Sequence, residues 1–163
     1  LGHTDTELQC NHELKEQIVR IIRTVKPNIV MTIDPTFYFS VEPFWGHEYH
    51  FINHTDHRAA GLAAMDAVFP LARDRLTFPM HEKEGLAPHS VEELWLLHWG
   101  RKDVDFLVDI SDTLETKLKA IAAHTSQYDT FDEIKGRMTL RATKYAEKES
   151  YQYAETFIRL LMP

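Results

Sequence analysis

The stretch that decides the fold is HELKEQIVRIIRTVKPNIVMTIDP, residues 12–35. Its first part places apolar side chains at the spacing of one helical face, which predicts an amphipathic helix over residues 12–26. Pro27 ends that helix. The apolar run at residues 29–33, which stops at Asp34, is typical of a strand buried on both faces of a parallel sheet. A helix that leads into such a strand is half of an α/β unit.

The remaining segments extend this pattern along the chain. A second helix begins near residue 55 and is closed or kinked by Pro70. Buried strands are predicted at 91–99 and 105–111, and helices at 112–128, capped by Ser111 or Asp112, and at 131–149. Residues 151–161 fit a strand or a helix end equally well. We therefore expect a single α/β domain over residues 1–163, with a mostly parallel, Rossmann-like sheet flanked by helices.

Residues 35–53 interrupt the pattern with an aromatic stretch that contains two prolines. We expect a long irregular loop there, and loops of this length are usually functional. His47 and His50 lie in it and are candidates to line a pocket. The same stretch can equally serve as packing or as a contact in a homo-oligomer.

Composition excludes several classes of function. The net charge of −7 offers no basic face to nucleic acid or to an anionic membrane. No segment reaches the roughly 18 uninterrupted apolar residues of a membrane span. The single cysteine, Cys10, permits no internal disulfide and fits a reducing compartment such as the cytoplasm. Because the first residue is Leu1, we expect a processed or truncated chain.

The chemistry-bearing residues gather after the first predicted strand. Asp34 ends that strand, where α/β sheets bind their ligands, and His54, Asp56 and His57 follow at the start of the next helix. His54 and His57 are three residues apart and can face one pocket, as zinc-binding imidazoles do. The same residues can instead cap the helix. Of the other histidines, His12 and His81 are expected in solvent, and His124 lies near a helix end.

Five segments in order resemble the LmbE-like, or PIG-L-type, zinc-dependent N-deacetylases. HTDHRAAG resembles the family signature HPDHRAxG, and LGHTDTEL resembles LG-x-x-D-G-E-L. VKPNIVMTIDP is similar to the family strand that ends in DP. VDISDTLETKLKAIAAHTSQ is similar to a late family helix, and YAETF to its closing YAEAF.

This resemblance implies a Rossmann-like hydrolase that removes N-acetyl groups from amino sugars, such as N-acetylglucosamine, and from their conjugates. It implies zinc as the cofactor, with His57 as a metal ligand. By the same match His54 acts on the oxyanion or as a general acid, Asp56 holds its neighbouring histidine, and Tyr153 faces the scissile carbonyl.

The chain departs from the family in one large respect. The first family signature, A-H-P-D-D-E, supplies two further zinc ligands and the general base, and this sequence does not contain it. A smaller departure is Thr55 in place of proline. We therefore expect the C-terminal part of such an enzyme, without its first strand and helix. That part alone is expected to be inactive and prone to aggregate through an exposed sheet edge.

Two alternatives stay open. The metallo-β-lactamase motif H-x-H-x-D-H resembles INHTDH, but Ile52 stands where the first histidine is required. The chain can also be a non-catalytic α/β domain that has lost its metal site.

Overall fold

The computed structural model describes residues 1–44, 47–97, 106–127 and 130–163. The chain divides into two compact units: Leu1–Asp103 with Ile158–Pro163, and Val104–Phe157. The expectation of a single domain stays a prediction. No helix within the described ranges is long and apolar enough to cross a membrane.

Helix α1 (His12–Val25) confirms the helix predicted from the opening stretch. The side chain of Asn11 caps it by accepting the Leu14 amide hydrogen at 2.9 Å. Lys26 adopts a left-handed conformation with φ 52° and donates its amide hydrogen to the Ile22 carbonyl at 2.8 Å. This left-handed residue, followed at once by Pro27, ends the helix one residue earlier than predicted.

The strands form a mixed sheet, and the α/β layered fold is confirmed. Strand β1 (Ile29–Ile33) pairs in parallel with β4 (Glu93–Leu97). The prediction that β1 is buried on both faces is wrong, because Ile29 and Met31 are exposed on one face. Strand β5 (Phe106–Asp109) pairs antiparallel with β6 (Ala154–Leu161). The hydrogen-bonded order is β1-β4-β6-β5, and β6 continues from the second unit into the first. The ambiguous C-terminal segment is thus a strand. Parts of the predicted strands 91–99 and 105–111 lie outside the described residues.

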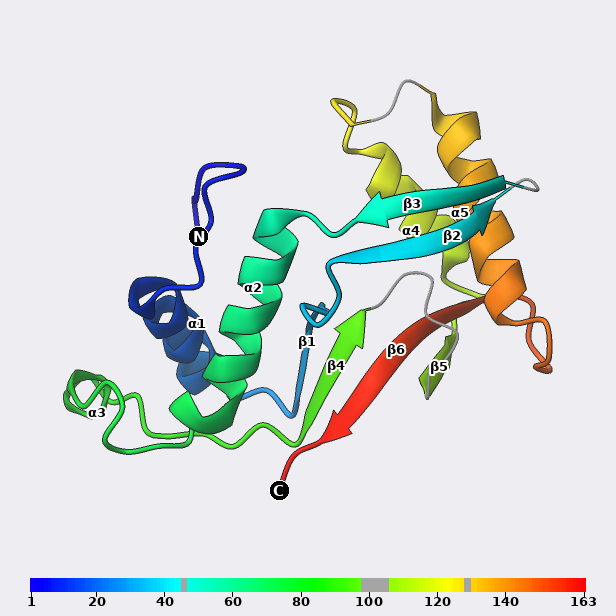
Figure 1. Ribbon diagram of the computed structural model, residues 1–163. Coiled ribbons are helices and arrows are strands. Elements are labelled where there is room, and N and C mark those ends of the chain that lie inside the picture. The colour runs from blue at the N-terminus through cyan, green and yellow to red at the C-terminus, as the bar shows by residue number, and fades with distance from the viewer. Residues whose placement is uncertain (45–46, 98–105, 128–129) are drawn as a thin grey trace. The chain divides into compact units, whose positions relative to one another are not determined.

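The core of the first unit joins α1, the segment that follows α2, and the strands β1 and β4 (Figure 1). Its buried members are Val19, Ile22, Ala67, Val68, Ala72, Phe78, Val91, Leu94 and Leu96. Helix α2 (Thr55–Asp66) ends before Pro70, as predicted, in an irregular turn at Ala67–Leu71. A short helix, α3 (Met80–Lys83), was not predicted.

The prediction of an irregular loop at residues 35–53 is wrong for most of that stretch. Strands β2 (Phe39–Phe44) and β3 (His47–Ile52) pair antiparallel as a two-stranded ribbon. Phe39 lies opposite Ile52, and Val41 lies opposite His50. Aromatic residues at adjacent positions, together with Pro43, hide the alternation that ordinarily marks a strand.

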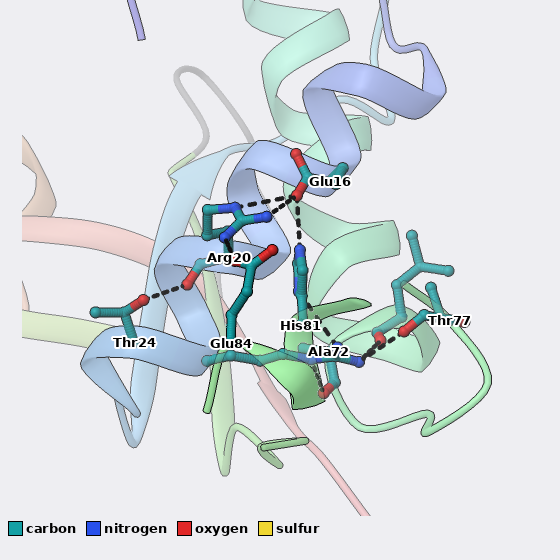
Figure 2. Close-up of polar contacts among 9 residues, drawn as sticks. Glu16, Arg20, Thr24, Ala72, Thr77, His81 and Glu84 are labelled. Carbon is teal, nitrogen blue, oxygen red and sulfur yellow. Dashed lines mark hydrogen bonds and ion pairs between the residues drawn. The ribbon is translucent and has the colours of Figure 1, made fainter. Parts of the chain in front are cut away.

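The prediction that His81 is solvated is also wrong, because its side chain is fully buried. Its Nε2 lies 2.6 Å from Glu16 Oε1 on α1 (Figure 2). Its Nδ1 lies 3.3 Å from Arg23 Nη1. An arginine can only donate, so Nδ1 accepts and the ring proton sits on Nε2, facing Glu16. Buried Arg23 also donates to four backbone carbonyls, those of Leu71, Ala72, Asp74 and Thr77. This network fixes α1 to the segment from Leu71 to α3.

The second unit contains α4 (Leu114–Ala122) and α5 (Phe131–Tyr145), both shorter than predicted. The predicted cap of α4 is wrong: Thr113 occupies the cap position, and Ser111 instead donates its hydroxyl to Asp109 at 2.6 Å. Ile110, Leu114, Leu118 and Ala142 form the buried cluster of this unit.

Candidate active site at the start of α2

A glycine places the middle of α2 against the end of β1. A Cβ atom on Gly61 would lie 2.3 Å from the backbone oxygen of Ile33, the last residue of β1. Only glycine allows this approach, since real Cβ contacts below 3.0 Å are essentially never seen. His57 lies one turn before Gly61 on the same helical face. The glycine therefore brings His57 to the carboxyl end of the strand.

His54 and His57 lie side by side in the first turn, as their spacing predicts. Their ring centroids are 5.4 Å apart, with an angle of 50° between the planes. His54 is also the N-cap: its Nδ1 accepts the Asp56 amide hydrogen at 3.2 Å. In the neutral ring, the His54 proton is then on Nε2. The capping interpretation is thus confirmed for His54, and it leaves Nε2 for a substrate contact.

The surroundings of His57 favour its neutral form. Burial lowers the pKa of His57 below its ordinary value, and the neighbouring His54 lowers it further, while Asp56 and Asp5 partly oppose both effects. A neutral imidazole is the form that binds a metal ion. The state that a zinc ligand requires is therefore the dominant state of His57 at neutral pH.

Asp56 fastens the N-terminal segment to α2. Its Oδ2 accepts the amide hydrogen of Thr6 at 2.7 Å, and its Oδ1 is buried. No local pattern predicts this contact, which joins residues 50 positions apart. Support of a neighbouring histidine by Asp56 stays a prediction.

Asp34 and Asn53 fix the backbone between the end of β1 and the start of α2. Asp34 is fully buried, and its Oδ1 accepts hydrogen bonds from the amide and the hydroxyl of Thr36 at 2.8 and 2.6 Å. Buried Asn53 donates its amide to the carbonyls of Asp34 and Phe37 at 3.2 and 3.1 Å. Asn53 thus ties the base of the β2–β3 ribbon to the end of β1. Sequence reasoning missed Asn53, although it directly precedes the histidine motif.

The remaining candidates lie elsewhere. Tyr153 is half-buried in the second unit and packs against the cluster of Ile110 and Leu114, while its amide donates to Ser111 Oγ at 3.3 Å. His50 is exposed on β3, and His124 is exposed after α4. The side chain of His47 lies outside the described residues.

Among the described residues, His57 fits the role of a single zinc ligand. Within the described ranges, no group of three or more His, Cys, Asp and Glu side chains is arranged to hold a metal ion. His57 has the protonation state of a ligand, and His54 lies beside it. A catalytic zinc usually takes three protein ligands, so the described part of the chain does not complete such a site.

Two deacetylases of known identity are similar to this chain. Diacetylchitobiose deacetylase from Thermococcus kodakarensis is 31% identical over 161 residues, which cover 95% of this chain and 53% of that protein. The structure of N,N'-diacetylchitobiose deacetylase from Pyrococcus horikoshii, complexed with its inhibitor MPG, superposes with a TM-score of 0.78 at 28% identity. That match covers 98% of this chain and 55% of the other.

A further solved structure shares the fold. The conserved protein TT1542 from Thermus thermophilus matches with a TM-score of 0.74 at 24% identity, over all of this chain and 65% of that one. No family model matches the sequence. The chain therefore has the deacetylase fold and is similar to N-deacetylases of amino sugars, and it spans about half the length of the deacetylases it matches.

Proposed function

We propose that this chain carries part of the active site of a zinc-dependent N-deacetylase of the LmbE/PIG-L type, acting on an N-acetylated amino sugar or its conjugate. The observation that carries the proposal is the pair of imidazoles at the carboxyl end of β1, 5.4 Å apart and held there by Gly61. The likeness to diacetylchitobiose deacetylases supports the reaction class and the kind of substrate.

The two histidines have different tasks in this proposal. His57, kept neutral by burial and by His54, is the zinc ligand. His54 carries its proton on Nε2, because Nδ1 accepts the Asp56 amide. The Nε2–H group can donate a hydrogen bond to the oxyanion of a tetrahedral intermediate. The resemblance assigns Tyr153 as a further donor that faces the scissile carbonyl.

Zinc, when bound, supplies Lewis-acid activation of water and of the acetyl carbonyl. A single imidazole holds zinc weakly, so the remaining ligands and the general base must come from an A-H-P-D-D-E-like segment that these 163 residues do not contain. The oligomeric state and the cytoplasmic location stay predictions.

The test uses the full-length protein. Zinc content and amine release from diacetylchitobiose are measured for the wild type, His57→Ala and His54→Ala. We expect His57→Ala to lose both zinc and turnover. We expect His54→Ala to keep zinc and to lose roughly 10²–10³-fold in kcat, the usual cost of one oxyanion donor.

The matched control is His12→Ala, an exposed histidine at the start of α1. It should change neither zinc content nor turnover. Full zinc content in His57→Ala would contradict the ligand assignment. A wild-type protein with stoichiometric zinc and no amine release would contradict the deacetylase assignment.

A further inference from the structure

An open pocket of about 500 Å³ lies beside α2. The N-terminal segment, the loop after β1 and one face of α2 line it, with Cys10, Tyr38, Arg58, Leu62 and Met65 among the lining residues. On α2, the lining positions include 58, 62 and 65, whereas His57 and Gly61 share the face towards β1. Successive helical residues are rotated by about 100°. His57 therefore lies on a different face of α2 from the lining residues, whereas His54, four residues before Arg58, adjoins the pocket.

Arg58 is fixed at this pocket. Its Nη1 donates to the carbonyl of Asn53, and its guanidinium carbon lies 4.9 Å from the centre of the Tyr38 ring. One hydrogen bond and one cation–π contact leave other N–H groups of the planar guanidinium for a ligand. Two contacts already position the guanidinium. A ligand that binds it therefore causes little further loss of side-chain conformational entropy.

The charge of Arg58 has no counter-ion in the described part of the chain, where no carboxylate forms an ion pair with it. The nearby Lys15, by contrast, is neutralised by Asp66 at 2.7 Å. The first turn of α2 adds the positive end of its helix dipole. In a chain with a net charge of −7, a positioned arginine beside a pocket favours an anionic ligand.

Much of the remaining lining is apolar, and Gln9, Thr36 and Thr55 add polar groups. Leu8, Pro35, Ala59, Leu62 and Met65 provide hydrocarbon surface next to the guanidinium. Such a surface favours a ligand with an apolar body over a bare inorganic ion. We propose that this pocket binds a small organic anion, with its phosphate or carboxylate on Arg58 and its apolar body against Leu62 and Met65.

Cys10 makes the pocket directly testable, because it is the only cysteine of the chain and lines the pocket. Burial raises the pKa of its thiol, so labelling with the neutral reagent iodoacetamide is done at mildly alkaline pH. The probe is phenyl phosphate. At about three times its Kd it should slow the labelling of Cys10 about fourfold, whereas inorganic phosphate and neutral phenyl glucoside at the same concentration should protect much less.

Two variants form a matched pair. Arg58→Gln should abolish the protection. Arg73→Gln should retain it, although Arg73 is held in the same manner, 5.4 Å over the Phe69 ring and donating to the Pro163 carbonyl at 2.9 Å. A third variant, Leu62→Asp, places a negative charge on the half-exposed apolar wall and should also abolish protection.

Equal protection in the wild type and Arg58→Gln would overturn the inference, as would equal protection by phenyl phosphate and phenyl glucoside. Absence of protection in a wild-type chain whose Cys10 labels readily would overturn it as well. None of these readouts depends on zinc or on turnover, so this site and the proposed deacetylase activity fail or succeed separately.

Discussion

At the scale of single residues, the two glycines inside described helices meet opposite surroundings. Gly61 in α2 faces the backbone oxygen of Ile33 and the ring of Pro35, while nothing lies within 4 Å of a Cβ built on Gly136 in α5. The same mutation to alanine therefore tests close packing at one site and helix propensity at the other.

We expect Gly61→Ala to destabilise the protein by about 1–3 kcal/mol or more, since a backbone carbonyl cannot move away as a side chain can. Gly136→Ala should stabilise it by up to about 1 kcal/mol, because alanine is the better helix former and no atom opposes its methyl group. Urea unfolding followed by circular dichroism gives both values. A neutral or stabilising Gly61→Ala would contradict the close approach of α2 to β1.

A second prediction concerns the buried polar contacts of His81. His81→Phe keeps the volume of the ring but removes the acceptor for Arg23 and the donor for Glu16. Glu16 keeps its hydrogen bonds from Arg20, but Arg23 Nη1 loses its acceptor. Leaving one buried polar group without a partner costs about 1–3 kcal/mol, and this variant should lose that much in free energy of unfolding. His89→Phe, which removes one contact to the Pro27 carbonyl, should lose less. A larger loss in His89→Phe would contradict the network.

At the scale of elements, Glu93 connects β4 with β6. It accepts two hydrogen bonds from Arg159 and one from Trp95 Nε1 at 2.7 Å. The Arg159 guanidinium, and then the Trp95 hydrogen bond, lower the pKa of Glu93 to about 2. A carboxyl group whose pKa is depressed in the folded state adds stability above its unfolded pKa, and this stability is lost as the pH falls through the folded value.

We therefore expect the thermal midpoint of the wild type to fall between about pH 4.5 and pH 2, and Glu93→Gln to have a shallower fall in that window. The exposed neighbour Glu92→Gln should keep the wild-type slope. Calorimetry at several pH values measures the midpoints. An identical slope in Glu93→Gln and the wild type would contradict the role of this pair.

The elements that sequence reasoning found are those whose signal is local. The periodic apolar residues of α1 and the apolar run of β1 each specify their structure without distant contacts, and the i, i+3 spacing of His54 and His57 brought their rings together. The failures depend on long-range partners. His81 is buried because Glu16 and Arg23, more than 50 residues away, satisfy its ring nitrogens. Thr6, likewise, reaches Asp56 only in the folded chain.

At the scale of the molecule, the first unit exposes one face of its sheet. Val30 packs into the core, so its neighbours Ile29 and Met31 point to the opposite face, where they are 42% and 57% exposed. Leu160 packs into the core in the same way, and Leu161 is 71% exposed. The register places Met31 opposite Trp95 on this face. β1 also ends the strand order, so an edge adjoins the apolar face.

Exposed apolar surface beside a sheet edge favours self-association, so the 163-residue chain expressed alone should associate as its concentration rises. Met31→Lys should raise the apparent dissociation constant roughly tenfold or more, because burial of one methionine contributes about 1.5–3 kcal/mol. Leu76→Lys is the control, since Leu76 is 87% exposed and lies outside this sheet; it should leave association unchanged. Sedimentation velocity over a concentration series decides: a wild-type chain that stays a monomer throughout, or equal effects of the two lysines, would show that this face does not drive association.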